Sequence, residues 1–251
     1  MRQHSFSAPK AAHFSRREAL LLGAAASVGS TLLSQPALGS EHAPAAAPAA
    51  TAAPTGTPVA IVLSEGATVI DFAGPWEVFQ DASGSEGHGD PNGYELFTVA
   101  ATRAPITATA GLQIIPNFTF ADAPQPAIVV VGAQKGGPAV IEYLKWVHSR
   151  AQLTMSVCTG AFQLARAGLL DGLSATTHHD YYDQFAAAFP KVKLVRGTRY
   201  VDHGSIATAG GLTSGLDLAL HVVSQRMGKK AAEVTASYME YVGNPLEGTT
   251  S

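Results

Sequence analysis

The sequence predicts an α/β fold built around a largely parallel central sheet. Between residues 58 and 243, short apolar runs alternate with helical patterns, and the connections between them are brief. Strands that alternate with helices form βα units, and such units assemble a parallel sheet. Because 46% of the 251 residues are hydrophobic and no apolar run has membrane-spanning length, we expect one soluble domain.

The individual elements follow from period and composition. Runs rich in β-branched residues that do not alternate with polar ones indicate strands buried on both faces, as at 59–63 and 127–131. The other elements expected in the first half are a helix over 71–79, a surface loop over 83–93, a strand over 94–101, a hairpin over 106–115 and an amphipathic helix over 138–150. Those expected in the second half are a strand over 153–157, a helical run over 162–167, a short strand over 174–177 and closing helices over 213–227 and 229–242, with Thr213 as a helix N-cap.

Both ends of the chain have compositions that set them apart from this domain. Residues 1–39 resemble a twin-arginine signal peptide, since Arg16 and Arg17 precede an uncharged apolar run and small residues lie before Ser40. Residues 40–57, almost entirely Ala, Pro and Thr, predict a disordered linker, and 244–251 a C-terminal tail. We therefore expect an exported protein, periplasmic or secreted, without membrane contact once the signal is removed.

The charge balance excludes one class of partner. Removing the leader's four basic residues and one acidic residue from the totals leaves 12 Lys and Arg against 18 Asp and Glu, a net charge of −6. A surface that follows phosphates needs clustered basic residues, so we expect no nucleic-acid partner.

The single cysteine, Cys158, is placed where a nucleophile would be. It follows the strand expected at 153–157, and small residues come directly after it before the helical run. This is a nucleophile-elbow pattern, in which Gly160 keeps the turn tight and the following amides face a developing oxyanion. A thiol at a helix N-terminus is expected to have a lowered pKa. The alternative is a small core residue at the end of a strand.

At this point the chain resembles the DJ-1/PfpI superfamily, in the branch shared by isonitrile hydratases and the amidase-like domains of AraC-type regulators. The segments that carry the resemblance are Asp71-Phe72-Ala73-Gly74-Pro75, Ser156-Val157-Cys158-Thr159-Gly160-Ala161, Gly168-Leu169-Leu170-Asp171-Gly172, Ala175-Thr176-Thr177-His178 and Gly210-Gly211-Leu212-Thr213-Ser214-Gly215-Leu216-Asp217. The resemblance implies a flavodoxin-like three-layer sandwich, a homodimer, a small-molecule substrate or ligand, and no cofactor.

The resemblance also implies roles for individual residues. Cys158, Asp71 and Thr159 are expected to be catalytic, with Asp71 holding a proton against the sulfur. The alternative interpretation is that Asp71 is a carboxylate at the start of a helix, stabilised by the helix dipole, and the two interpretations are compatible. Proteases of the PfpI type have a histidine where this chain has Thr159, which argues against proteolysis.

Four further positions are candidate catalytic or pocket residues. Gly132 and Gly160 allow close approach of backbone, and Gly211 packs near the elbow. His178 is either a base for the thiol or a structural, pocket-lining residue. We expect no metal, because His178 and His179 come near the end of the strand expected over 174–177, and adjacent residues on a strand point to opposite faces.

Three functions remain open at this point. The first is a cysteine-dependent hydratase or hydrolase resembling isonitrile hydratase, a lyase that would attack an electrophilic carbon through Cys158. The second is a non-catalytic exported module that binds a ligand or senses stress. The third is a glyoxalase or deglycase-like enzyme.

Overall fold

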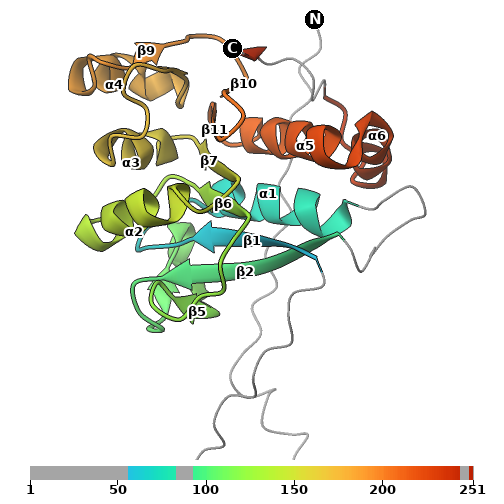
Figure 1. Cartoon of the computed structure of the whole chain (residues 1–251), viewed down its shortest axis with the longest axis horizontal. Helices are drawn as coiled ribbons and strands as arrows, with labels where there is room; N and C mark the ends of the chain where they lie inside the picture. Colours follow the sequence, from blue (N-terminus) through green and yellow to red (C-terminus); the bar gives the residue numbers. More distant parts are fainter. Residues whose placement is uncertain (1–55, 83–92, 244–248, 251) are drawn as a thin grey trace, which may run out of the picture. The chain divides into compact units, whose positions relative to one another are not determined.

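The computed structural model describes residues 56–82, 93–243 and 249–250. The expected signal peptide, nearly all of the linker and the loop expected over 83–93 lie outside these ranges, apart from Gly56, Thr57 and Gly93. The part of the chain that is described forms a sandwich with a central, mostly parallel sheet (Figure 1). This arrangement confirms the predicted α/β fold.

Eight strands form the main sheet in the order β12-β10-β11-β7-β6-β1-β2-β5 among the described residues. In chain order these are β1 (Thr57–Val62), β2 (Tyr94–Ala100), β5 (Phe118–Thr119), β6 (Ile128–Val131), β7 (Leu153–Val157), β10 (Tyr200–Asp202), β11 (Ile206–Ala209) and β12 (Thr249–Thr250). The strands from β11 to β5 are parallel, and β10 is antiparallel to β11. Because β12 pairs with β10, the segment expected as a tail contributes an edge strand.

Two short pairs lie outside the main sheet. The antiparallel pair β3 (Ile106–Thr107) and β4 (Gln113–Ile114) is the predicted hairpin. The parallel pair β8 (Ser174–Ala175) and β9 (Lys193–Leu194) includes the strand expected over 174–177, which ends two residues earlier than predicted.

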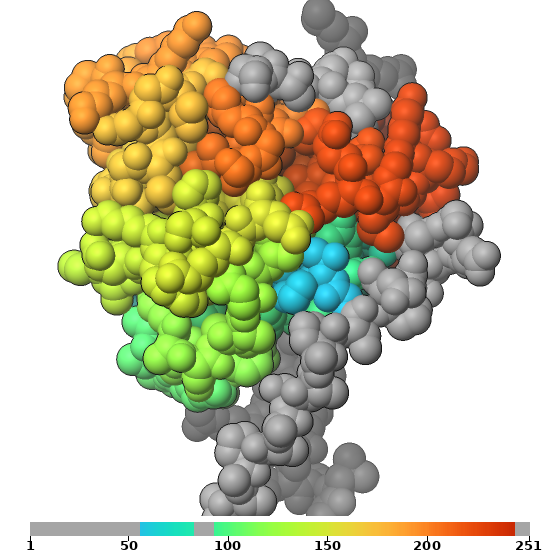
Figure 2. Space-filling view, viewed as in Figure 1, coloured from blue at the N-terminus to red at the C-terminus, as the bar shows by residue number. Residues whose placement is uncertain are grey.

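Helices cover both faces of the sheet. On one face pack α1 (Val69–Asp81), α5 (Ser214–Met227) and α6 (Lys229–Tyr238), and on the other α2 (Pro138–His148), α3 (Gly160–Arg166) and α4 (Tyr182–Ala188). Two short 3₁₀ turns, Thr109–Gly111 and His179–Tyr181, complete the described elements. In the space-filling view, the yellow-green and orange-red helical segments leave only a small blue patch from the start of the described chain visible (Figure 2).

Alternate residues of the central strands supply two hydrophobic clusters. Val59 and Ile61 of β1 point into the cluster under α1 and α5, whereas Ala60 and Val62 point into the cluster under α2 and α3. Side chains along a strand alternate between faces, so a strand covered on both sides must be apolar throughout. This is why the non-alternating run predicted a central strand correctly.

No helix in the described ranges has both the length and the apolar character that crossing a bilayer requires.

Candidate active site

The elbow is a sharp turn between β7 and α3. Cys158 lies between them with φ of 59°, in the left-handed region that residues other than glycine seldom adopt. Its N–H donates to the carbonyl of Gly210 at 2.7 Å, and its own carbonyl accepts from Thr177 Oγ1 at 2.9 Å. These two bonds hold a conformation that costs of order 1–3 kcal/mol, and they tie the elbow to β11 and to the segment after β8.

Gly160 and Gly132 provide the space that the turn requires. A Cβ on Gly160 would lie 2.1 Å from the carbonyl oxygen of Val131, and one on Gly132 would lie 2.7 Å from Cβ of Asp71. Any side chain at either position would displace backbone. The prediction that small residues are needed here is therefore supported by the packing.

Asp71 is a fully buried carboxyl in the first turn of α1. Its Oδ2 accepts a hydrogen bond from the N–H of Ala133 at 2.9 Å, and its Oδ1 is buried without a hydrogen bond of good geometry from any described donor. The N–H of Ala133 is therefore committed to orienting the Asp71 carboxyl rather than a substrate.

Burial raises the pKa of Asp71 to about 6, and hydrogen bonding from the Ala133 N–H, the Cys158 thiol and the Leu212 N–H lowers it from a still higher value. Burial also raises the pKa of the Cys158 thiol to about 12, and the negative charge of Asp71 adds to this effect. Each group thus shifts the pKa of the other, and their catalytic roles stay a prediction. At neutral pH the thiol carries its proton and the carboxyl is largely ionised.

The predicted lowering of the thiol pKa is wrong. The helix that begins after Cys158, α3, spans only seven residues, and the cysteine is 6% exposed. Loss of water and the adjacent carboxylate outweigh the favourable N–H groups of Thr159 and Leu212, which act in the opposite direction. The thiol is therefore buried and protonated rather than an exposed, ionised thiolate.

Leu212 is a contributor that sequence reasoning missed. Its φ is 53°, and its N–H lowers the pKa of both Cys158 and Asp71. The glycine pair before it was expected only to pack closely. Thr213 occupies the N-cap position as predicted, but its hydroxyl accepts from Arg199 Nη2 at 3.1 Å and does not cap the helix.

His178 packs on Gly211 and is not hydrogen-bonded to the thiol within the described structure. A Cβ on Gly211 would lie 2.0 Å from Cδ2 of His178, so the glycine makes room for the ring. Nδ1 of His178 accepts from the N–H of Asp180 at 3.2 Å, which starts the 3₁₀ turn. This geometry favours the structural, pocket-wall interpretation of His178.

The geometric reason given against a metal is wrong, although the expectation of no metal stays a prediction. His178 and His179 do not lie on a strand, since β8 ends at Ala175. Their rings stack with centroids 4.4 Å apart, and one ligand atom from each, with one from Asp180, lies within 4.8 Å of the others.

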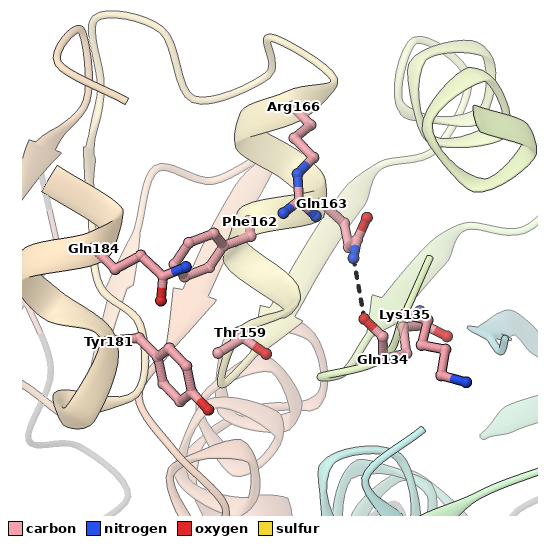
Figure 3. Close-up of a pocket in the computed structure, with 8 residues that line it drawn as sticks. All are labelled: Gln134, Lys135, Thr159, Phe162, Gln163, Arg166, Tyr181 and Gln184. Atoms are coloured by element: carbon pink, nitrogen blue, oxygen red, sulfur yellow. Dashed lines mark hydrogen bonds between the residues drawn. The ribbon is translucent and has the colours of Figure 1, made fainter. Parts of the chain in front are cut away.

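A polar cavity of about 200 Å³ opens beside the elbow (Figure 3). Its lining residues are Gln134, Lys135, Thr159, Phe162, Gln163, Arg166, Tyr181 and Gln184. Thr159, one residue after the nucleophile candidate, places the cavity next to the reacting centre. The sequence held a signal for part of this wall, because Thr159, Gln163 and Arg166 are spaced as one face of a helix.

A protein-family comparison decides the identity of the fold. The DJ-1/PfpI family pattern matches residues 57–225, about two thirds of the chain. The chain belongs to the DJ-1/PfpI family.

Relatives within and around this family differ in function. An isonitrile hydratase from Pseudomonas putida is 32% identical over 184 residues, which cover 70% of this chain and 75% of the hydratase. The transcriptional regulator GbdR from Pseudomonas aeruginosa is 28% identical over 153 residues, which cover 59% of this chain and only 41% of the regulator. Sequence similarity therefore extends both to an enzyme and to part of a DNA-binding regulator.

Solved structures agree with the fold. A ThiJ/PfpI family protein from Pseudomonas syringae superposes with a TM-score of 0.65 at 28% identity, covering 76% of this chain and 77% of that one. Drosophila melanogaster DJ-1beta superposes with a TM-score of 0.63 at 18% identity, covering 75% of this chain and all of that one. The flavodoxin-like sandwich implied by the DJ-1/PfpI resemblance is confirmed.

Proposed function

We propose that this protein is a cysteine-dependent hydratase of small isonitriles. Cys158 is the nucleophile, Asp71 transfers the proton, and Thr159 contributes its amide beside the sulfur. The observation that carries the proposal is the buried contact between a protonated thiol and a largely ionised carboxylate. The identity to an isonitrile hydratase supports the choice of substrate class.

The reaction adds water to R–NC and yields the formamide R–NH–CHO. The sulfur attacks the terminal carbon while the thiol proton passes through Asp71 to that same carbon, which gives a thioimidate bound to Cys158. Water then adds to the thioimidate carbon, one of its protons goes to nitrogen, and the C–S bond breaks. The remaining water proton returns to the sulfur, so the enzyme is regenerated.

A protonated thiol suits this chemistry better than a free thiolate does. The terminal carbon of an isonitrile must gain both a proton and a sulfur, and the pair formed by Cys158 and Asp71 supplies both. Burial, which raises the pKa values of both groups, keeps the transferable proton within the site. Hydrolysis of an activated amide would need no proton on carbon, so it makes less use of this arrangement.

The test is turnover of an alkyl isonitrile by the purified protein. We expect NMR to detect the corresponding formamide, and intact-protein mass spectrometry of rapidly quenched samples to show an adduct heavier by the whole isonitrile. Absence of both product and adduct at millimolar substrate would refute the hydratase proposal.

The second candidate is an exported module that binds a ligand without turnover. The similarity to HTH-type transcriptional regulators supports it, because the names of these relatives indicate regulation rather than catalysis. Saturable ligand binding by calorimetry, combined with no turnover of isonitriles or 2-oxoaldehydes, would favour this candidate. A turnover number that depends on Cys158 would exclude it.

Export and dimerisation are part of the proposal. The paired Arg16 and Arg17 support a twin-arginine signal, and family resemblance supports a homodimer. Changing both arginines to lysine is expected to keep the protein out of the periplasmic fraction of a Gram-negative host.

Light scattering of the mature form is expected to give twice the chain mass, and a monomer mass at micromolar concentration would contradict the dimer.

A further inference from the structure

The cavity beside the elbow is lined by positive charges and by no negative ones. Lys135 and Arg166 are its charged lining residues, and none of its lining residues is acidic. Neither cation forms an ion pair with a carboxylate in the described parts of the chain, where ten ion pairs involve other residues. Two unpaired cations at one small cavity favour an anionic ligand.

Arg166 is an exposed residue that lies beside an aromatic ring. Its guanidinium carbon lies 5.8 Å from the centre of the Phe162 ring, close enough for a cation–π interaction. Figure 3 shows the guanidinium on the α3 wall, between the side chains of Phe162 and Gln163. A planar guanidinium in this position can form two parallel hydrogen bonds to one carboxylate.

Gln163 lines the cavity as a nearly fully buried polar side chain. It is 2% exposed, and its Nε2 donates to the carbonyl of Gln134 at 3.2 Å. Its Oε1 has no hydrogen-bond partner among the described residues and packs against Gly136, where an added Cβ would lie 2.4 Å from it. The bond to Gln134 therefore fixes the part of the wall that lies next to Arg166.

Size and position restrict the ligand further. The volume of about 200 Å³ lies below the roughly 300–1,000 Å³ of sites that take drug-sized molecules. Thr159 lines the cavity and directly follows Cys158, which is not itself a lining residue, so the cavity borders the turn that carries the sulfur.

We infer that this cavity binds the carboxylate of the substrate, with Arg166 as the principal contact and Lys135 as a supporting charge. The substrate class is then a small molecule with a carboxylate at one end and the reactive group at the other. This inference rests on the proposed function for the reactive group, but the binding of the carboxylate can be measured separately.

The test compares two isonitriles that differ only in a terminal carboxylate or its neutral methyl ester. We expect the wild type to have a kcat/KM about tenfold or more higher for the carboxylate, and Arg166→Gln to lose that preference while retaining turnover of the ester. Arg150→Gln is the matched control, since Arg150 also lies over an aromatic ring, Trp146, but outside the cavity. Equal kcat/KM for the two compounds in the wild type would overturn the inference.

A binding experiment separates this inference from the hydratase proposal. Succinate, titrated calorimetrically into the wild type, Arg166→Gln and Arg150→Gln, needs no turnover. We expect saturable binding that Arg166→Gln weakens about tenfold and Arg150→Gln leaves unchanged, even if isonitriles prove not to be substrates. No binding to the wild type, or equal binding to all three proteins, would contradict the carboxylate site.

Discussion

Asp71 and Asp202 each lie against a titratable partner, and their pKa values move in opposite directions. Asp71 has the Cys158 thiol beside it, and burial raises its pKa to about 6. Asp202 accepts a hydrogen bond from Nε2 of the buried His221 at 2.8 Å, and this bond lowers its pKa. The first carboxyl is held against a neutral group, the second against a group that can carry positive charge.

The two opposite pKa shifts have opposite effects on the stability of the folded protein. A hydrogen-bonded imidazole compensates for the burial of the Asp202 charge, so this pair favours the folded state when the carboxylate is ionised. A neutral thiol offsets little of the cost of burying the Asp71 charge, so that charge opposes folding. Strained or destabilised groups concentrate at reactive sites, and the elbow, with its left-handed Cys158, shows the same pattern.

The largest expected effect comes from Cys158→Ala. Without the sulfur no thioimidate forms, and we expect turnover of the isonitrile to fall by at least about 1,000-fold, as for other nucleophile deletions. The circular dichroism spectrum should match that of the wild type. A variant that retains a tenth of the activity would show that the sulfur is not the nucleophile.

Asp71→Asn is expected to reduce turnover by about 100-fold or more while making the protein more stable at pH 8. Asp71 has a folded pKa of about 6 against a model-peptide value of 3.8, so its contribution to stability falls as pH rises between these values and then stays constant. The gain on substitution is up to about 3 kcal/mol. Urea unfolding should show that gain at pH 8 and little of it at pH 4, and destabilisation at pH 8 would contradict the account.

Asp202→Asn is the matched substitution with the opposite sign. Because the pKa of Asp202 is lowered, its stabilising contribution is present above the usual Asp pKa and is lost as pH falls through the folded value. We expect a loss of about 1–3 kcal/mol near pH 7 that shrinks toward pH 3. Urea midpoints measured across this range give the comparison directly. A stabilised Asp202→Asn at pH 7 would remove the contrast between the two pairs.

The smallest effect is expected from Thr177→Val, which removes the hydrogen bond to the Cys158 carbonyl. A loss of about 1 kcal/mol in unfolding free energy and a several-fold loss in kcat are expected, because the left-handed turn would be held less firmly. Thr176→Val is the control, since the hydroxyl of Thr176 is buried without a hydrogen-bond partner among the described residues and its removal should cost little. Equal effects of the two substitutions would show that the Thr177 bond does not matter.

The sequence predicted the scaffold well because local chemistry determines it. Non-alternating β-branched runs such as Val129 to Val131 identified buried strands, and small residues around Cys158 identified the elbow. The thiol pKa was predicted in the wrong direction because it depends on how deeply the turn is buried. Burial arises when distant segments, including the one that carries Leu212, close over the sulfur.

The remaining misses have a similar origin. His178 and His179 were expected near the end of a strand, but that strand ends at Ala175, so the stacking of their rings was not predicted. The cavity beside Thr159 combines α3 with residues after β6, in the 3₁₀ turn and in α4, which lie far apart in the sequence. Contacts between segments far apart in the sequence produce no periodic pattern of residues from which they could be predicted.

The rate at which iodoacetamide alkylates Cys158, followed by intact mass from pH 6 to pH 10, tests the central claim most directly. Cys158 is the only cysteine, so no other thiol contributes. A thiol pKa near 12 predicts a rate that keeps rising with each pH unit and reaches no plateau by pH 10. A plateau below pH 8 would show that the sulfur is already a thiolate at neutral pH, and the coupled pair of Cys158 and Asp71 would have to be abandoned.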